Sequence, residues 1–109
     1  MRLETFYTSI ASGFANSPTI ELKGADLFGL WAPIVTSCQI FIKGSFDTTS
    51  ANFVRLQNPA GSGDWIFGVG PGSKAVTLQD PAFPWPYLRV ETSVNQADTR
   101  SFAITVKVR

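Results

Sequence analysis

The sequence predicts an all-β domain, an antiparallel two-sheet sandwich that is jelly-roll-like. Short stretches in which apolar and polar residues alternate recur along most of the chain, and a period of two is typical of half-buried strands. Nine glycines and seven prolines are scattered between these stretches, as in strand–turn–strand structures. The longer segments without them are rich in Val, Ile, Thr and Phe, which favour strands over helices. A chain of 109 residues corresponds to one such domain.

Three candidate strands lie in the first third of the chain. Residues 3–10 alternate only weakly and are predicted to form either a first strand or an arm. Residues 19–23 place two apolar side chains on one side and two charged ones on the other. Residues 30–35 contain Pro33, which has no backbone N–H to donate. This strand is therefore expected at a sheet edge or a bulge.

Four further candidates occupy the middle of the chain. Residues 38–46 alternate strongly and place their apolar side chains, including the single cysteine, on one side. Residues 52–56, 65–69 and 75–78 are shorter. A glycine–proline–glycine turn at residues 70–72 separates the last two, and a hairpin turn explains these glycines better than a phosphate-binding loop, because no Lys-Ser/Thr ending follows.

The last two candidate strands have the clearest patterns. Residues 87–92 and 101–109 both alternate between apolar and polar side chains over their whole length. Such alternation predicts one face toward a core and one toward solvent. The side chains expected to face the core are Leu88, Val90, Phe102, Ile104, Val106 and Val108.

The chain is expected to divide into an N-terminal arm, residues 1–18, and a single β-sandwich domain, residues 19–109. An extended arm can add a strand to a neighbour's sheet edge. The longest uncharged run, residues 27–42, is shorter than the roughly 20 residues that span a bilayer and is broken by glycine and proline. The net charge of +1 argues against a nucleic-acid partner. We therefore expect no membrane and no nucleic-acid binding.

The residues that usually carry catalysis are scarce. There is no histidine and one cysteine, which excludes His-dependent catalysis and a thiolate zinc cluster. Cys38 is predicted to be a small buried apolar residue. The eight carboxylates are dispersed, and solvated surface acids explain them better than a glycosidase pair. The sequence predicts no enzyme, no metal and no cofactor.

Aromatic residues are the more informative candidates. Phe83, Trp85 and Tyr87 alternate with prolines, whose fixed φ stiffens the segment. Two interpretations stay open: a plug over the open end of the sandwich, or a contact patch for a protein partner. Phe6 and Tyr7, in the arm, are predicted as a second contact. A stacking platform for sugar would instead need flat, exposed rings, for which the candidates are Trp31, Trp65 and Trp85.

Residues 30–109 resemble a group of small structural proteins of tailed bacteriophages and prophages. The motifs occur in the same order and at similar spacing in that group. Here they are Trp31-Ala32-Pro33-Ile34, Gly44-Ser45-Phe46-Asp47 with Phe53, Gln79-Asp80-Pro81, Tyr87-Leu88-Arg89-Val90 and Gln96-Ala97-Asp98-Thr99-Arg100. No glycine follows Asp47, and the segment Phe83-Pro84-Trp85-Pro86 is an insertion relative to the group.

The resemblance implies a capsid decoration (cement) protein that binds the outer capsid surface between coat subunits and stabilises the shell. The expected partner is the major capsid protein, and the expected assembly is a homo-oligomer, with a trimer favoured. The protein would be made in the host cytoplasm and reside on the capsid surface of the virion. The alternative function is a recognition module of a phage fibre or tail that binds host glycan or another virion protein.

Overall fold

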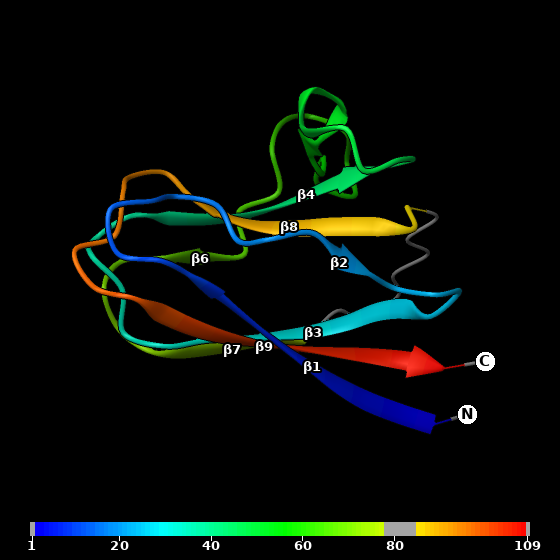
Figure 1. The fold of residues 1–109 in the computed structure, drawn as a ribbon, viewed down its shortest axis with the longest axis horizontal. Helices are drawn as coiled ribbons and strands as arrows, with labels where there is room; N and C mark the ends of the chain where they lie inside the picture. Colours follow the sequence, from blue (N-terminus) through cyan, green and yellow to red (C-terminus); the bar gives the residue numbers. More distant parts are fainter. Residues whose placement is uncertain (1, 78–84, 109) are drawn as a thin grey trace.

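The fold is a sandwich of two antiparallel sheets, seen edge-on in Figure 1. This computed structural model describes residues 2–77 and 85–108. The first sheet, called sheet A, has the strand order β1-β9-β3-β7, and the second, sheet B, has the order β2-β8-β4-β5, with β6 also paired to β4. The all-β, two-sheet prediction is confirmed. The strands are β1 (Arg2–Ile10), β2 (Ile20–Glu21), β3 (Asp26–Ala32), β4 (Gln39–Ser45), β5 (Val54–Arg55), β6 (Gly68–Val69), β7 (Lys74–Thr77), β8 (Tyr87–Thr92) and β9 (Arg100–Val108).

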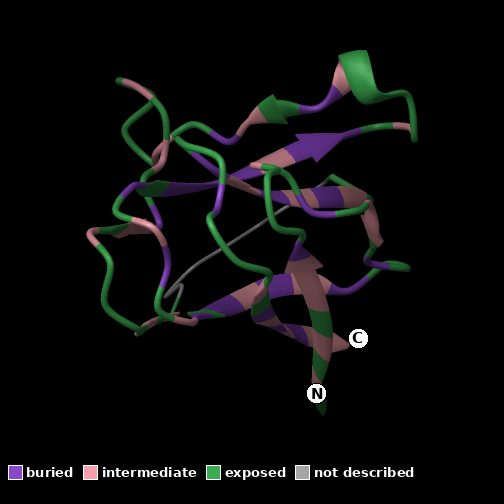
Figure 2. Cartoon of the chain, turned by 60° about the vertical axis from the view of Figure 1, so that its left-hand side comes forward, coloured by how far each residue is buried: buried purple, intermediate pink, exposed green. Residues whose placement is uncertain are grey.

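The core lies between the two sheets, where the buried segments of both layers face each other in Figure 2. Burial of a large apolar side chain contributes about 1.5–3 kcal/mol, so the alternating strands dominate the stability. The predicted inward residues of β8 and β9 are confirmed, except that Val108 is only partly buried at the end of its strand. The apolar side chains of these strands that are at most 1% exposed are Leu88, Val90, Phe102, Ile104 and Val106.

Several predicted strands differ in extent from the observed ones. The predicted strands over residues 19–23 and 65–69 are reduced to the two residues of β2 and of β6. β3 begins at Asp26 and ends at Ala32, one residue before Pro33, because proline cannot continue the ladder. The predicted strand over residues 52–56 is reduced to the two residues of β5, preceded by a 3-10 turn over Ser50–Asn52. The Asp47 carboxylate folds the chain here: it accepts hydrogen bonds from the Thr49 backbone N–H (3.0 Å) and the Asn52 side-chain amide (3.0 Å).

The segment predicted as an arm lies against its own domain wherever the structure describes it. All nine residues of β1 pair with β9, from Arg2 opposite Val108 to Ile10 opposite Arg100. Residues 11–18 then cross to sheet B and run beside β8, where the Thr92 N–H donates to the Ala15 carbonyl (2.8 Å). The extended conformation agrees with the arm interpretation, but the strands that pair with it belong to the same chain.

Gln96 ties together the loops at the end of the sandwich opposite the two termini. Its side chain is 1% exposed and its Oε1 accepts hydrogen bonds from the Thr36 N–H (2.8 Å) and from Nε of Arg100 (3.3 Å). Its backbone N–H donates to the Phe14 carbonyl (2.9 Å). By contrast, Asp98 is exposed and lies 4.0 Å from Arg100. Gln96 therefore connects these three loops.

Replacement of Gln96 by Leu should destabilise the fold. The change keeps most of the volume but leaves the partly buried Thr36 N–H without its acceptor, which costs about 1–3 kcal/mol. Urea unfolding followed by circular dichroism measures the loss. Asn95→Ala, at the exposed neighbouring position, is the matched control and should stay within about 0.5 kcal/mol of the wild type. Equal stabilities for both variants would contradict this role of Gln96.

Candidate binding face on sheet A

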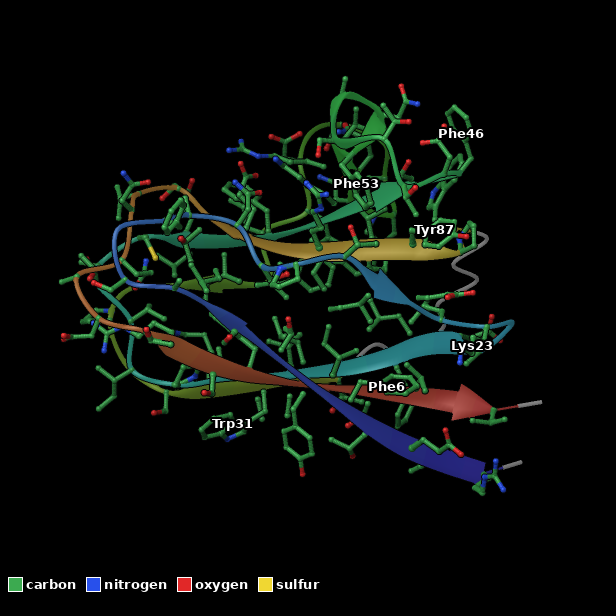
Figure 3. The ribbon with its side chains drawn as sticks, in the orientation of Figure 1. Phe6, Lys23, Trp31, Phe46, Phe53 and Tyr87 are labelled. Atoms are coloured by element: carbon green, nitrogen blue, oxygen red, sulfur yellow. The ribbon has the colours of Figure 1, made fainter. Side chains whose placement is uncertain are left out.

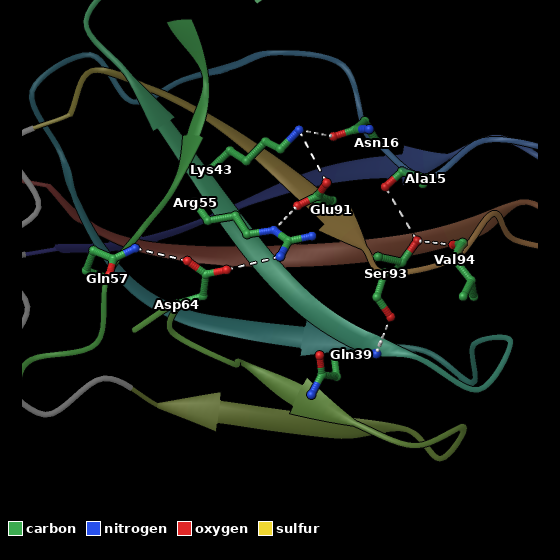
Figure 4. Close-up of polar contacts among 11 residues, drawn as sticks. Ala15, Asn16, Gln39, Lys43, Arg55, Gln57, Asp64, Glu91, Ser93 and Val94 are labelled. Carbon is green, nitrogen blue, oxygen red and sulfur yellow. Dashed lines mark hydrogen bonds and ion pairs between the residues drawn. The ribbon is translucent and has the colours of Figure 1, made fainter. Parts of the chain in front are cut away.

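The outer face of sheet B is occupied by the chain's own charged side chains (Figure 4). The Arg55 guanidinium lies 3.8 Å from the centre of the Phe41 ring, which covers that aromatic side chain. The same guanidinium donates to Glu91 (2.6 Å) and to Asp64 (3.0 Å). Lys43 forms an ion pair with Glu91 as well (3.4 Å). This network holds the long segment between β4 and β6 against the sheet. The charges of Lys43, Arg55, Asp64 and Glu91 are paired within it.

A second cation on sheet B also lies over an aromatic ring. The Arg89 guanidinium lies 4.2 Å from the centre of the Phe53 ring. It also donates hydrogen bonds to the hydroxyls of Thr19 (3.1 Å) and Ser50 (3.2 Å). Both contacts use side chains from the segments that cross over sheet B. The polar groups of this face are thus engaged in holding the fold.

The outer face of sheet A is open and carries a row of aromatic and small side chains. In the strand register, Tyr7 of β1 lies opposite Ala103 of β9, Ala103 lies opposite Trp31 of β3, and Trp31 lies opposite Ala75 of β7. Tyr7 is 80% exposed and Trp31 is 48% exposed. In Figure 3 Trp31 projects away from sheet B, whereas Phe46, Phe53 and Tyr87 lie with the other layer. We call the side chains of Tyr7, Ala103, Trp31 and Ala75 the aromatic row.

Hydroxyl groups flank the aromatic row on both sides. On one side the register aligns the side chains of Thr5, Thr105 and Thr77, and on the other it pairs Ser9 with Ser101. Gly29 completes the first of these rows. A Cβ at Gly29 would lie 3.1 Å from the Val76 carbonyl oxygen, so a side chain would not fit there without a backbone shift.

On this face of the described chain, charged residues lie near the end of the sheet where the chain termini are. One register step beyond the threonine row, Leu3 lies opposite Lys107, and Lys107 lies opposite Asp26. The Lys107 ammonium lies 4.2 Å from the centre of the Phe28 ring. In the described part of the chain, the aromatic row and its two hydroxyl rows contain no charged residue. The centre of the face is therefore neutral, and exposed rings are surrounded by hydroxyls.

This chemistry suits the binding of a partly apolar ligand. Exposed rings stack on apolar surfaces, and hydroxyls exchange hydrogen bonds with polar rims. Among the described residues, the aromatic row and the hydroxyl rows contain no carboxylate. Within residues 2–77 and 85–108 no group of three or more His, Cys, Asp or Glu side chains is placed to hold a metal ion. The described residues also include no helix with the length and apolarity to cross a membrane.

The predicted contact residues are distributed over both sheets. Phe83 lies outside the described residues. Trp85 packs on the backbone of Gly44, where a Cβ would lie 3.0 Å from the indole Cγ, and beside the core residue Leu56. Trp85 remains 42% exposed. Tyr87 is partly buried in β8 and pairs in register with Ser45.

The two arm residues point to opposite sides of sheet A. Phe6 packs against the core and Tyr7 lies on the outer face, because successive residues of a strand alternate. Of the three candidate tryptophans, Trp65 is stacked on Phe67 with ring centres 4.8 Å apart and packs against the core. Trp31 is the one whose ring shares an open sheet face with a second exposed aromatic residue. The small residue between them, Ala103, had no signal of its own in the sequence.

Comparison with known proteins gives likenesses of shape at low identity. No family model matches the chain, and no curated protein matches it. CBM32-1 from a family 31 glycoside hydrolase of Clostridium perfringens is similar to it at 11% identity and a TM-score of 0.49, over 94% of this chain and 76% of that one. The family 32 CBM of C. perfringens NanJ, in complex with galactose, is 8% identical with a TM-score of 0.42, over 92% and 93% of the two chains. The Yersinia pseudotuberculosis-derived mitogen is 9% identical with a TM-score of 0.41, over 99% and 86%.

The charged network on sheet B predicts a pH dependence of stability. Arg55, and next Gln57, lower the pKa of Asp64 below its ordinary 3.8. A carboxyl whose pKa is lowered by folding stabilises the native state fully above its unfolded pKa, and this contribution is lost as the pH falls through the folded value. Wild type should therefore exceed Asp64→Asn in stability at pH 6, and the difference should shrink between about pH 4 and pH 2. Urea midpoints measured across this range test it, and a difference independent of pH would contradict it.

Proposed function

We propose that this chain is a non-catalytic recognition domain that binds glycan through the outer face of sheet A. The observation that carries the proposal is the aromatic row, in which Tyr7 and Trp31 flank Ala103 on the open side of the sheet. Neighbouring strands lie about 4.8 Å apart, so the two aromatic residues are separated by about 9.5 Å. Between them the alanine leaves a shallow floor with an aromatic side chain at each end.

The amphipathic nature of a sugar ring matches this arrangement. The faces of a pyranose carry C–H groups, and its rim carries hydroxyls. Aromatic rings bind the faces by dispersion and apolar burial, while the threonine and serine rows can exchange hydrogen bonds with the rim. Because β1, β9 and β3 are paired over most of their length, the side chains stand on a rigid sheet, which reduces the entropy lost on binding.

The setting that we propose for this activity is a fibre or tail of a phage virion. The support for this setting is the resemblance of residues 30–109 to small phage structural proteins. In such an assembly many copies of a weakly binding domain act together, and effective concentration raises the overall affinity well above that of one site. A neutral, shallow face of modest area fits binding of that kind.

Loss of either ring should weaken glycan binding without unfolding the domain. Trp31→Ala and Tyr7→Ala each remove a large exposed side chain from the face, and we expect at least a tenfold rise in Kd, about 1.4 kcal/mol, for each. A glycan array identifies a ligand, and calorimetry with that ligand measures the change. Phe46→Ala removes a similarly exposed aromatic side chain, 65% exposed, from the other layer and should bind as wild type. Equal binding by all three variants would contradict the proposed site.

The second candidate function is capsid decoration, with the major capsid protein as partner and a homo-trimer as the assembly. It is favoured by a separate group of exposed apolar residues beside Gly44: Val54, paired with Gly44 and 64% exposed, Trp85 at 42%, and Phe46 two residues further along the chain. Exposed apolar groups of this kind mark contact surfaces. They lie on sheet B or beside it, away from the aromatic row.

Co-sedimentation with mature, undecorated phage capsids tests this second function. If it holds, the protein binds saturably at a fixed ratio to coat protein, and Phe46→Ala and Trp85→Ala weaken the binding severalfold while Trp31→Ala does not. Trp85 packs on the backbone of Gly44, so Phe46→Ala is the cleaner variant. Light scattering of the free protein reports the oligomeric state. Absence of binding to capsids would exclude decoration and leave glycan recognition standing.

A further inference from the structure

We infer that the ligand of the sheet A face is a neutral, extended chain of β-linked pyranose units that lies across the strands, rather than a single terminal sugar or an acidic glycan. The inference rests on the proposed function and specifies its ligand. Its basis is the order of side chains across four strands, in the sequence Tyr7, Ala103, Trp31 and Ala75.

The spacing of the aromatic row sets the length of the ligand. The two aromatic residues stand two strand spacings apart, about 9.5 Å, and the whole row crosses three spacings, about 14 Å. One pyranose ring covers about one spacing, so a single sugar reaches one aromatic residue only. Two linked units reach both Tyr7 and Trp31, and a third lies over Ala75 at the edge strand β7. Affinity should therefore rise up to about three units and then level off.

The direction of the row sets the shape of the ligand. Tyr7, Ala103 and Trp31 are aligned across the strands because the register between β1, β9 and β3 places them opposite one another. A straight ligand is needed to follow such a row. Equatorial β-linkages make a sugar chain extended and ribbon-like, and they leave the C–H faces of successive rings available for stacking. The hydroxyls at both rims of such a ribbon then point toward the threonine row and the serine row.

The charge of the face sets the charge of the ligand. The aromatic row and its hydroxyl rows contain no cation among the described residues, and Lys107, at the terminal end of this face, is engaged with the Phe28 ring at 4.2 Å. A uronic or sialic acid carboxylate would lose hydration here without gaining a partner, which disfavours its binding. The face should therefore discriminate against acidic glycans even when their linkages are β.

A length series of defined probes tests the inference. The probes are β-1,4-linked gluco-oligosaccharides of one to six units, with oligogalacturonides of the same lengths as the acidic comparison, titrated into the full chain by calorimetry. We expect Kd to fall by at least tenfold from the monosaccharide to the trisaccharide and by less than twofold from the trisaccharide to the hexasaccharide. The acidic series should bind at least tenfold more weakly than the neutral one.

Variants separate the parts of this inference. Trp31→Ala should abolish the gain from one to three units, because the second ring is lost. Thr105→Val removes a half-buried hydroxyl from the face but keeps the shape of the side chain. This change should weaken binding of the trisaccharide severalfold. Asn95→Ala, at an exposed position outside this sheet, should change neither the gain nor the affinity.

The outcomes distinguish failure of the inference from failure of the proposed function. Equal affinity for the monosaccharide and trisaccharide, or tighter binding of the acidic series, would overturn the inference while leaving a glycan-binding domain. Binding of a different glycan from an array, lost in Trp31→Ala, would have the same meaning. Absence of binding to these series and to every glycan of an array would overturn the proposed function together with the inference.

Discussion

The alternation of side chains along β9 is the constraint on which both the fold and the candidate site depend. β9 lies between β1 and β3 in sheet A, so each of its residues has neighbours on two strands. Phe102, Ile104 and Val106 face inward and are at most 1% exposed. The residues between them, including Ala103 and Thr105, form the floor of the open face. One strand thus supplies the centre of the core and the centre of the binding face.

This arrangement couples the register of sheet A to its surface chemistry. A slip of one residue between β9 and either neighbour would turn inward residues outward. Burial of Ile104 between Phe6 and Leu30 opposes such a slip, because it would move three apolar side chains out of the core. The same register fixes the separation of Tyr7 and Trp31. The core therefore determines the geometry of the face, and no contact among the surface side chains is needed to hold it.

The two sheets use their outer faces differently. On sheet B, Arg55 and Arg89 cover aromatic rings. Arg55 binds the carboxylates of Glu91 and Asp64, and Arg89 binds the hydroxyls of Thr19 and Ser50. Paired charges and covered rings stabilise the fold but offer little to a ligand. On sheet A, the rings of Tyr7 and Trp31 stay exposed, and hydroxyls rather than charges surround them. The candidate binding face thus lies on one side of the molecule, and the charged network that braces the fold lies on the other.

Local patterns predicted what depends on local spacing. The period of two in β8 and β9 predicts both strands and their buried residues correctly. Pro33 predicted a sheet edge or a bulge for residues 30–35, whereas β3 lies between β9 and β7 and ends before the proline. The insertion of β9 between β1 and β3 was not predictable from such patterns, because it joins residues about 75 to 100 positions apart. For the same reason Trp31 remained one of three candidate tryptophans, and Phe6 and Tyr7 were grouped although alternation places them on opposite sides.

The roles of two polar residues, Asp47 and Gln96, do not follow from local sequence patterns. In the structure, Asp47 holds a turn together through hydrogen bonds, and Gln96 holds a set of loops together in the same way. Their roles depend on backbone groups that come close only after folding. These residues account for the shape of the loops, whereas the open face of sheet A depends on the pairing of its strands.

The most direct test of the central claim is a nuclear magnetic resonance titration that follows the three indole N–H signals. The three tryptophans occupy different places: Trp31 on the open face, Trp65 against Phe67, and Trp85 against Gly44. On addition of a β-linked tetrasaccharide, the signal of Trp31 should shift in a saturable manner, together with amides of Thr5–Ser9 and Ser101–Thr105, while the other two indoles stay in place. Shifts centred on Trp85, with Trp31 unchanged, would contradict the assignment of recognition to sheet A.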